Sequence, residues 1–154
     1  MSLNWYERKK NIPLAVKAFS EFLWMTKQSK PDFHLVIAGG YDDQVSENKE
    51  IYEELSSLTK EYGIWDQVTF LKSISNEVRV TLLNATDVML YTPENEHFGI
   101  VPVEAMYCGC IVFACNSGGP TESLVDGKTG FLLNGDSPSE WAKKLEEVFN
   151  LAKL

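Results

Sequence analysis

The sequence has few cysteines, and their arrangement excludes a disulfide-stabilised protein. Cys108, Cys110 and Cys115 form an odd, closely clustered set. Such a set is a poor disulfide framework, and Cys108-Gly109-Cys110 lacks the two-residue gap that is typical of redox or zinc pairs. We therefore expect three buried, reduced thiols in a cytoplasmic protein.

Basic residues and histidines are also scarce. The chain has 14 Lys and Arg against 22 Asp and Glu, which gives a formal net charge of -8. Nucleic-acid binding normally needs a basic excess, so we expect no nucleic-acid partner. The two histidines, His34 and His97, are far apart. Since Asp42-Asp43 is typical of a solvated turn, we expect no metal site.

Long hydrophobic runs and a targeting segment are absent from the sequence as given. No apolar run approaches the ~18 residues that cross a bilayer, and no signal peptide opens the chain. The 154 residues are 44% hydrophobic and 23% charged, which is ordinary for one globular domain. We interpret Met1-Ser2-Leu3 as residues of the kind that a cloning vector adds, and place the domain at residues 4–154.

What the chain does contain is an alternation of strand and helix patterns. We expect a helix after the cap Asn11, with Pro13 in its first turn and Pro31-Asp32 at its end. The other expected helices are Glu50–Tyr62 with Gly63 as its C-cap, a short one capped by Asn76, Gly99–Tyr107, and one opened by Ser137 and Pro138. The expected strands are Phe33–Ala38, Val68–Leu71, Asp87–Tyr91, Ile111–Ala114 and Phe131–Leu133, while 122–125 is left undecided.

These elements predict a doubly wound parallel α/β sheet of the Rossmann-like kind. The strands are continuous apolar runs, as in sheets that helices cover on both faces. Ligands of such sheets bind at the carboxyl ends of the strands. The loops that should meet a ligand are Gly39–Asp43, Leu71–Ser75, Thr92–Gly99 and Asn116–Thr121.

Two carboxylates mark the strongest candidate site. Glu96 follows a strand, and Glu104 lies near the start of the next helix, so both can face one crevice at that helix N-terminus. Free N–H groups and the helix dipole favour an anion such as phosphate there, and carboxylates accept strong hydrogen bonds from sugar hydroxyls. From spacing alone, a helix-favouring acid at Glu104 and a solvated charge at Glu96 are equally acceptable. Ser117–Glu122 is either a simple turn or a close approach of backbone to ligand.

Several segments in order resemble the retaining glycosyltransferases of family 4. The likeness rests on Glu96 and Glu104 with His97-Phe98-Gly99-Ile100 between them, followed by Ser117-Gly-Gly-Pro120 and Gly127-x-x-Gly130-Phe131-Leu132. Tyr6-Glu-Arg-Lys-Lys-Asn11 and Val36-Ile-Ala-Gly-Gly-Tyr41 extend it over almost the whole chain. Within the family, the chain is similar to mannosyltransferases that build the dolichol-linked oligosaccharide of N-glycosylation.

The resemblance implies the C-terminal, donor-binding half of a GT-B enzyme. Glu96 would be the catalytic residue that holds the mannose, and Glu104 would hold the ribose of GDP. Backbone around Gly99, Ile100 and Val101 would meet the diphosphate, which Lys10 would neutralise without a metal or other cofactor. The remaining implied donor-binding residues are Gly39, Gly40, His97 and Phe98, with Arg8 and Lys9 as further phosphate contacts.

One residue departs from the family pattern. The pattern has an arginine five positions before Lys10, where this sequence has Trp5. An indole cannot neutralise phosphate, so a non-catalytic nucleotide-sugar-binding module is an alternative to a transferase domain. A family 4 domain with another donor, such as a UDP-sugar, and an unrelated flavodoxin-like domain are further alternatives.

The same resemblance implies what lies beyond this chain. The lipid-linked oligosaccharide acceptor would bind an N-terminal domain that the sequence lacks, and catalysis by this half alone is not expected. Membrane association would come from segments outside the chain. The parent enzyme would work at the cytosolic face of the endoplasmic reticulum membrane.

Overall fold

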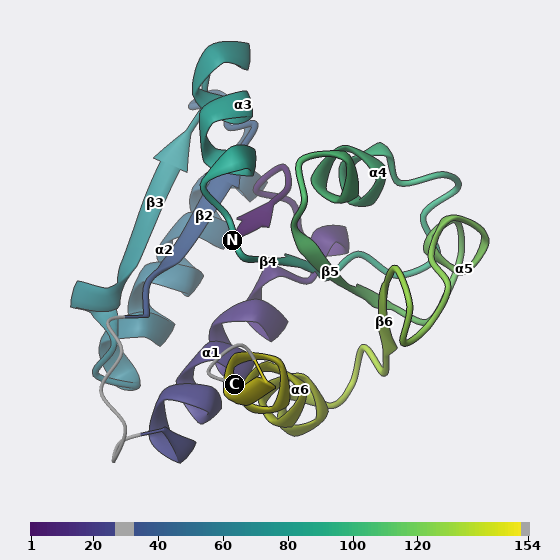
Figure 1. Ribbon diagram of the computed structural model, residues 1–154. Coiled ribbons are helices and arrows are strands. Elements are labelled where there is room, and N and C mark those ends of the chain that lie inside the picture. The colour runs from purple at the N-terminus through teal and green to yellow at the C-terminus, as the bar shows by residue number, and fades with distance from the viewer. Residues whose placement is uncertain (27–32, 152–154) are drawn as a thin grey trace.

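A computed structural model describes residues 1–26 and 33–151 as alternating strands and helices (Figure 1). The strands are β1 (Ser2–Leu3), β2 (Leu35–Gly39), β3 (Val68–Lys72), β4 (Val88–Tyr91), β5 (Ile111–Cys115) and β6 (Gly130–Leu133). The α-helices are α1 (Ile12–Met25), α2 (Ser46–Glu61), α3 (Asn76–Asn84), α4 (Ile100–Tyr107), α5 (Pro120–Ser123) and α6 (Pro138–Leu151). Two 3₁₀ turns, η1 (Arg8–Lys10) and η2 (Trp65–Gln67), complete the described elements.

The strands form two parallel sheets that meet edge to edge. One sheet has the order β1-β2-β3 and the other the order β4-β5-β6. The amino group of Met1 donates to the carbonyl of Val88 (2.8 Å), and Leu90 N–H donates to the carbonyl of Met1 (2.8 Å). These bonds set β1 beside β4, so the strands follow the order 3-2-1-4-5-6 of doubly wound nucleotide-binding folds.

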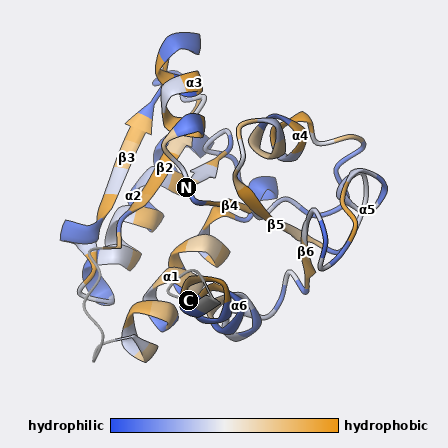
Figure 2. Cartoon of the chain, viewed as in Figure 1, coloured by the Kyte–Doolittle hydropathy of each residue, from blue (hydrophilic) through white to orange (hydrophobic). Residues whose placement is uncertain are grey.

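Helices cover both faces of the strands. Successive strand residues point to opposite sides, and apolar residues on both sides are buried under helices. Leu90 and Phe113 belong to the core cluster that contains residues of α1, α2 and α6, whereas their neighbours Met89 and Val112 belong to a second cluster with residues of α3 and α4. Figure 2 shows the strands as mainly hydrophobic ribbon. The predicted doubly wound parallel α/β fold is confirmed.

The first three residues belong to the fold, which corrects the expectation that the domain begins at residue 4. Ser2 and Leu3 pair in parallel with Ile37 and Ala38, and all of Met1–Leu3 is buried. They form the middle strand that links the two sheets. A strand of two residues is too short to show alternation, so the sequence pattern did not reveal it.

The predicted helices are present, but α2 begins at Ser46, four residues before the expected Glu50, and the capping differs at two helices. Asn11 precedes α1 as expected, but it does so through a left-handed backbone (φ 48°) rather than through a side-chain cap. Ser75, not Asn76, caps α3, because its Oγ accepts from Val78 N–H (3.2 Å). The undecided segment at 122–125 overlaps α5. The expected helix end at Pro31-Asp32 lies outside the described residues.

The cysteines are free, but only two of the three are buried as predicted. Cys110 and Cys115 lie in the core, whereas Cys108 at the end of α4 is half-exposed. Burial, together with the nearby negative charges of Glu94 and Asp136, raises the pKa of the Cys115 thiol to about 12. Among the residues described, no helix is both long and apolar enough to cross a membrane.

Candidate donor site

A pocket of about 460 Å³ opens at the carboxyl ends of the strands, where the fold predicts a ligand. Its walls come from the segment after β1, the end of β2, one residue of α3, and the connection from β4 into α4. Most of the residues predicted to bind the donor line it: Lys10, Gly39, Gly40, Glu96, Phe98, Gly99, Ile100 and Val101. The structure thus brings together residues that are up to 91 positions apart in the sequence (Lys10 to Val101).

The first turn of α4 forms one wall of this pocket. Gly99 is the N-cap residue and has a left-handed backbone (φ 73°), a conformation that glycine adopts without strain. Its Cα faces Tyr91, whose hydroxyl would lie 3.2 Å from a Cβ at this position. The N–H groups of a first helical turn have no partner within the helix, and they favour an anion.

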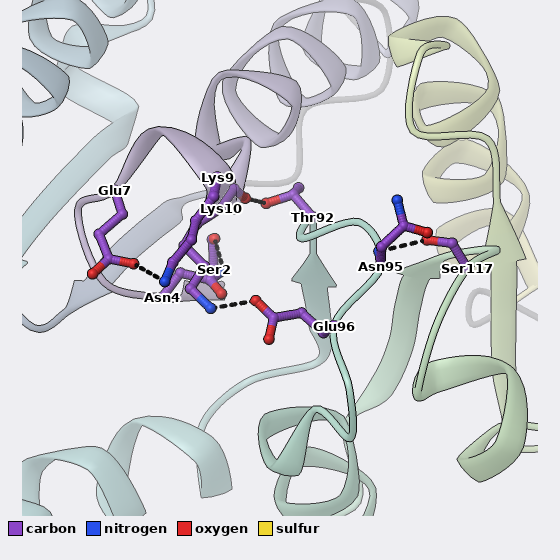
Figure 3. A network of polar contacts seen from close by, with 9 residues as sticks. All are labelled: Ser2, Asn4, Glu7, Lys9, Lys10, Thr92, Asn95, Glu96 and Ser117. Carbon is purple, nitrogen blue, oxygen red and sulfur yellow. Dashed lines mark hydrogen bonds and ion pairs between the residues drawn. The ribbon is translucent and has the colours of Figure 1, made fainter.

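Lys10 and Glu96 meet across the pocket (Figure 3). Lys10 Nζ donates to Glu96 Oε1, and the two side chains are only 15% and 26% exposed. Thr92 Oγ1 donates to the backbone carbonyl of Lys10 (2.6 Å) and ties η1 to the end of β4. A cation and a carboxylate are therefore held next to the start of α4.

The loop after β5 supports the loop that carries Glu96. Gly119 N–H donates to the carbonyl of Glu96 (2.7 Å), and Asn95 N–H donates to Ser117 Oγ (3.0 Å), as Figure 3 shows for the second contact. A Cβ at Gly119 would lie 2.1 Å from the carbonyl oxygen of Phe98. The backbone of Ser117–Pro120 thus packs closely against the loop that carries Glu96.

Glu104 lies beside the pocket rather than on its wall. Its Oε2 accepts from Arg79 Nη2, and the side chains are 38% and 30% exposed. Glu104 lines a neighbouring groove between α3 and α4, whereas Arg79 lines both the groove and the pocket. The two carboxylates that we expected in one crevice thus line two neighbouring depressions, and Arg79 lines both.

Besides Glu104, three other residues expected to contact the donor do not line the pocket. Arg8 pairs with Glu54 (3.1 Å) and Lys9 pairs with Glu7 (3.2 Å), and both cationic side chains are well exposed. His97 is also exposed and is not part of the pocket wall. Since η1 turns only the Lys10 side chain inward, we no longer assign phosphate contacts to Arg8 and Lys9.

Sequence reasoning missed Arg79 and Tyr91, which both line the pocket. Burial, together with the nearby negative charge of Glu96, raises the pKa of Tyr91 to about 12, so its hydroxyl is protonated at neutral pH. Tyr91 ends a strand that leads into the ligand loop, a position that could have identified it. Arg79 carries no comparable signal, because it lies in the middle of a short helix.

Trp5 also lines the pocket, at the position of the expected arginine. A Cβ at Gly40 would lie 2.3 Å from the indole ring, so the ring packs directly against that glycine. The structure therefore places an uncharged, half-exposed aromatic group on this wall. Within residues 1–26 and 33–151, no cluster of three or more His, Cys, Asp or Glu side chains could hold a metal ion.

Comparison with known proteins agrees with this geometry. The family model described as glycosyl transferases group 1 matches residues 1–154. The chain is 46% identical over 155 aligned residues to alpha-1,3/1,6-mannosyltransferase ALG2 of Homo sapiens, with 100% of this chain and 37% of that protein covered. The chain thus spans little more than a third of the length of that curated relative.

Two solved structures have the same fold. Sucrose-phosphate synthase from Thermosynechococcus elongatus superposes with a TM-score of 0.83 at 27% identity, covering 97% of this chain and 36% of that chain. The C-terminal domain of a glycosyl transferase group 1 family protein from Francisella tularensis gives 0.75 at 25% identity, covering 99% and 74%. The expected GT-B type of Rossmann-like fold is confirmed, and an unrelated flavodoxin-like domain is excluded. The chain belongs to the glycosyl transferases group 1 family.

Proposed function

We propose that this chain is the donor-binding half of a retaining mannosyltransferase that uses GDP-mannose. The observation that carries the proposal is the convergence of Lys10, Glu96 and the first turn of α4 in one pocket at the carboxyl ends of the strands. The printed name of the human relative, a mannosyltransferase, supports mannose as the transferred sugar.

Each group in the pocket suits one part of such a donor. The N–H groups at Gly99, Ile100 and Val101 and the ammonium of Lys10 stabilise the negative charge that develops on the departing diphosphate. Glu96 accepts hydrogen bonds from the sugar hydroxyls, and Glu104, in the neighbouring groove, accepts them from the ribose. The protonated Tyr91 hydroxyl adds an uncharged hydrogen-bond donor to the same wall. No metal is needed in this scheme, because a lysine and a helix N-terminus supply the positive charge.

The complete enzyme transfers mannose to a lipid-linked oligosaccharide in our proposal. The acceptor then binds a second domain across the cleft, at the cytosolic face of the endoplasmic reticulum membrane. This chain alone is expected to bind donor without turning it over. Trp5 in the pocket keeps a non-catalytic nucleotide-sugar-binding module as the second candidate, because the indole supplies no charge to the diphosphate.

Isothermal titration calorimetry in EDTA tests the donor assignment. We expect GDP and GDP-mannose to bind the chain more tightly than UDP and ADP. Lys10→Gln should weaken GDP binding, whereas Lys49→Gln, the same charge change on the exposed surface of α2, should leave it unchanged.

Four results would contradict parts of the proposal. Absence of heat with any nucleotide would contradict the donor site itself. A preference for UDP would move the donor to the UDP-sugars, and binding that requires added Mg²⁺ would contradict the metal-free scheme. If a longer protein that includes the acceptor domain binds the donor but transfers no sugar, the binding-module alternative replaces the enzyme.

A further inference from the structure

The donor pocket contains a second cation that the sequence pattern does not assign. Within residues 1–26 and 33–151, the cationic side chains that line the pocket are those of Lys10 and Arg79. Lys10 comes from η1 on one wall and Arg79 from α3 on another. The two therefore approach the start of α4 from different elements.

Both cations are paired with carboxylates in the structure. Lys10 contacts Glu96, and Arg79 contacts Glu104. Under the proposed function these carboxylates accept hydrogen bonds from hydroxyls of the sugar and the ribose. A bound donor therefore competes for the carboxylates and also offers its phosphates to the cations.

The single positive charge of Lys10 is small compared with the negative charge of a diphosphate. The diphosphate carries more than one negative charge, and the chain itself has a net charge of -8. Trp5, which occupies another part of the wall, supplies an aromatic ring and one uncharged N–H donor. Arg79 lines the same pocket, so it is positioned to add a second cationic side chain to Lys10 and the helix N-terminus.

The guanidinium of Arg79 can serve two partners at once. Its contact with Glu104 uses Nη2, and a guanidinium carries five N–H donors in a rigid fork that suits phosphate. We propose that Arg79 binds the diphosphate of the donor and is held by Glu104 until the donor arrives. This inference rests on the proposed function, since it needs a nucleoside diphosphate in the pocket.

Binding of guanosine, GMP and GDP separates a phosphate ligand from a residue that merely orients Glu104. For Arg79→Gln we expect about 10- to 100-fold weaker binding of GDP, the scale of lost hydrogen bonds to charged groups. Binding of guanosine should change less than about threefold, with GMP between the two. Arg79→Lys, which keeps the charge, should recover part of the loss. Arg8→Gln removes an equal charge outside the pocket and should bind all three ligands like the parent chain.

The outcomes discriminate between the two proposals. Equal losses for guanosine and GDP, or none for GDP, would overturn the phosphate role of Arg79 and leave the donor site intact. A parent chain that binds no nucleotide contradicts the proposed function and this inference together. Circular dichroism and thermal unfolding of each variant confirm that the losses come from folded protein.

Discussion

Glu96 and Glu104 are acidic residues on either side of the start of α4, but their surroundings in the structure differ. Glu96 lies on the pocket wall against Lys10, whereas Glu104 lies next to it against Arg79. Family resemblance identified both carboxylates and Lys10 from the sequence. It could not identify Arg79, because the partner of a side chain depends on which helices the fold places side by side.

Replacement of Glu104 tests its assignment to the ribose. We expect Glu104→Ala to weaken guanosine and GDP binding alike, by roughly 1–3 kcal/mol, the scale of lost hydrogen bonds to a charged group. Glu140→Ala, an exposed acid in the first turn of α6, provides the matched control. Calorimetric titration of both variants gives the comparison. Wild-type affinity in the Glu104 variant would remove this residue from the donor site.

At the scale of elements, the site depends on how one loop rests on another. The loop before α4 lies against the loop after β5, where Gly119 N–H donates to the carbonyl of Glu96. The glycine pair in Ser117–Pro120 is recognisable in sequence, but its role is not. A ligand contact and a loop contact require the same small residue, and only the three-dimensional arrangement distinguishes them.

Gly119→Ala should therefore act on the donor site rather than on its own loop. The new Cβ would lie 2.1 Å from the carbonyl oxygen of Phe98, so the Glu96 loop must move, at about 1–3 kcal/mol for overpacking. Gly127→Ala is the control, because that turn has a positive φ (73°) but open space around a Cβ. Both substitutions are expected to lower the midpoint of thermal unfolding, and only Gly119→Ala should also weaken GDP binding. Unchanged GDP affinity in the Gly119 variant would show that the loop tolerates the shift.

At the scale of the whole molecule, the shortest strand joins the two sheets. Ser2–Leu3 pairs with β2, and Met1 exchanges backbone hydrogen bonds with β4 at Val88 and Leu90. In Figure 1 the N-terminus lies between the two groups of strands. The pocket also lies beside this junction, since Leu3 and Asn4 line it together with residues of the β4–α4 connection.

Truncation of Leu3 measures how much this junction contributes to stability. Leu3 is 5% exposed, and we expect Leu3→Ala to lower the free energy of unfolding by about 2–5 kcal/mol. Val125→Ala, at a position that is 53% exposed, should change it by less than about 0.5 kcal/mol. Urea unfolding followed by circular dichroism provides both values. If the two variants lose equal stability, the first strand is not a central part of the fold.

The sequence by itself determined the fold class, because apolar runs in strands and periodic apolar residues in helices are local consequences of burial. It also determined most of the pocket, because Glu96, Gly99 and Lys10 lie in segments of recognisable order. Only the tertiary structure decided that Arg8 and Lys9 face away, that Arg79 pairs with Glu104, and that residues 1–3 are central. Those outcomes depend on contacts between residues far apart in the chain, and no local pattern in the sequence records such contacts.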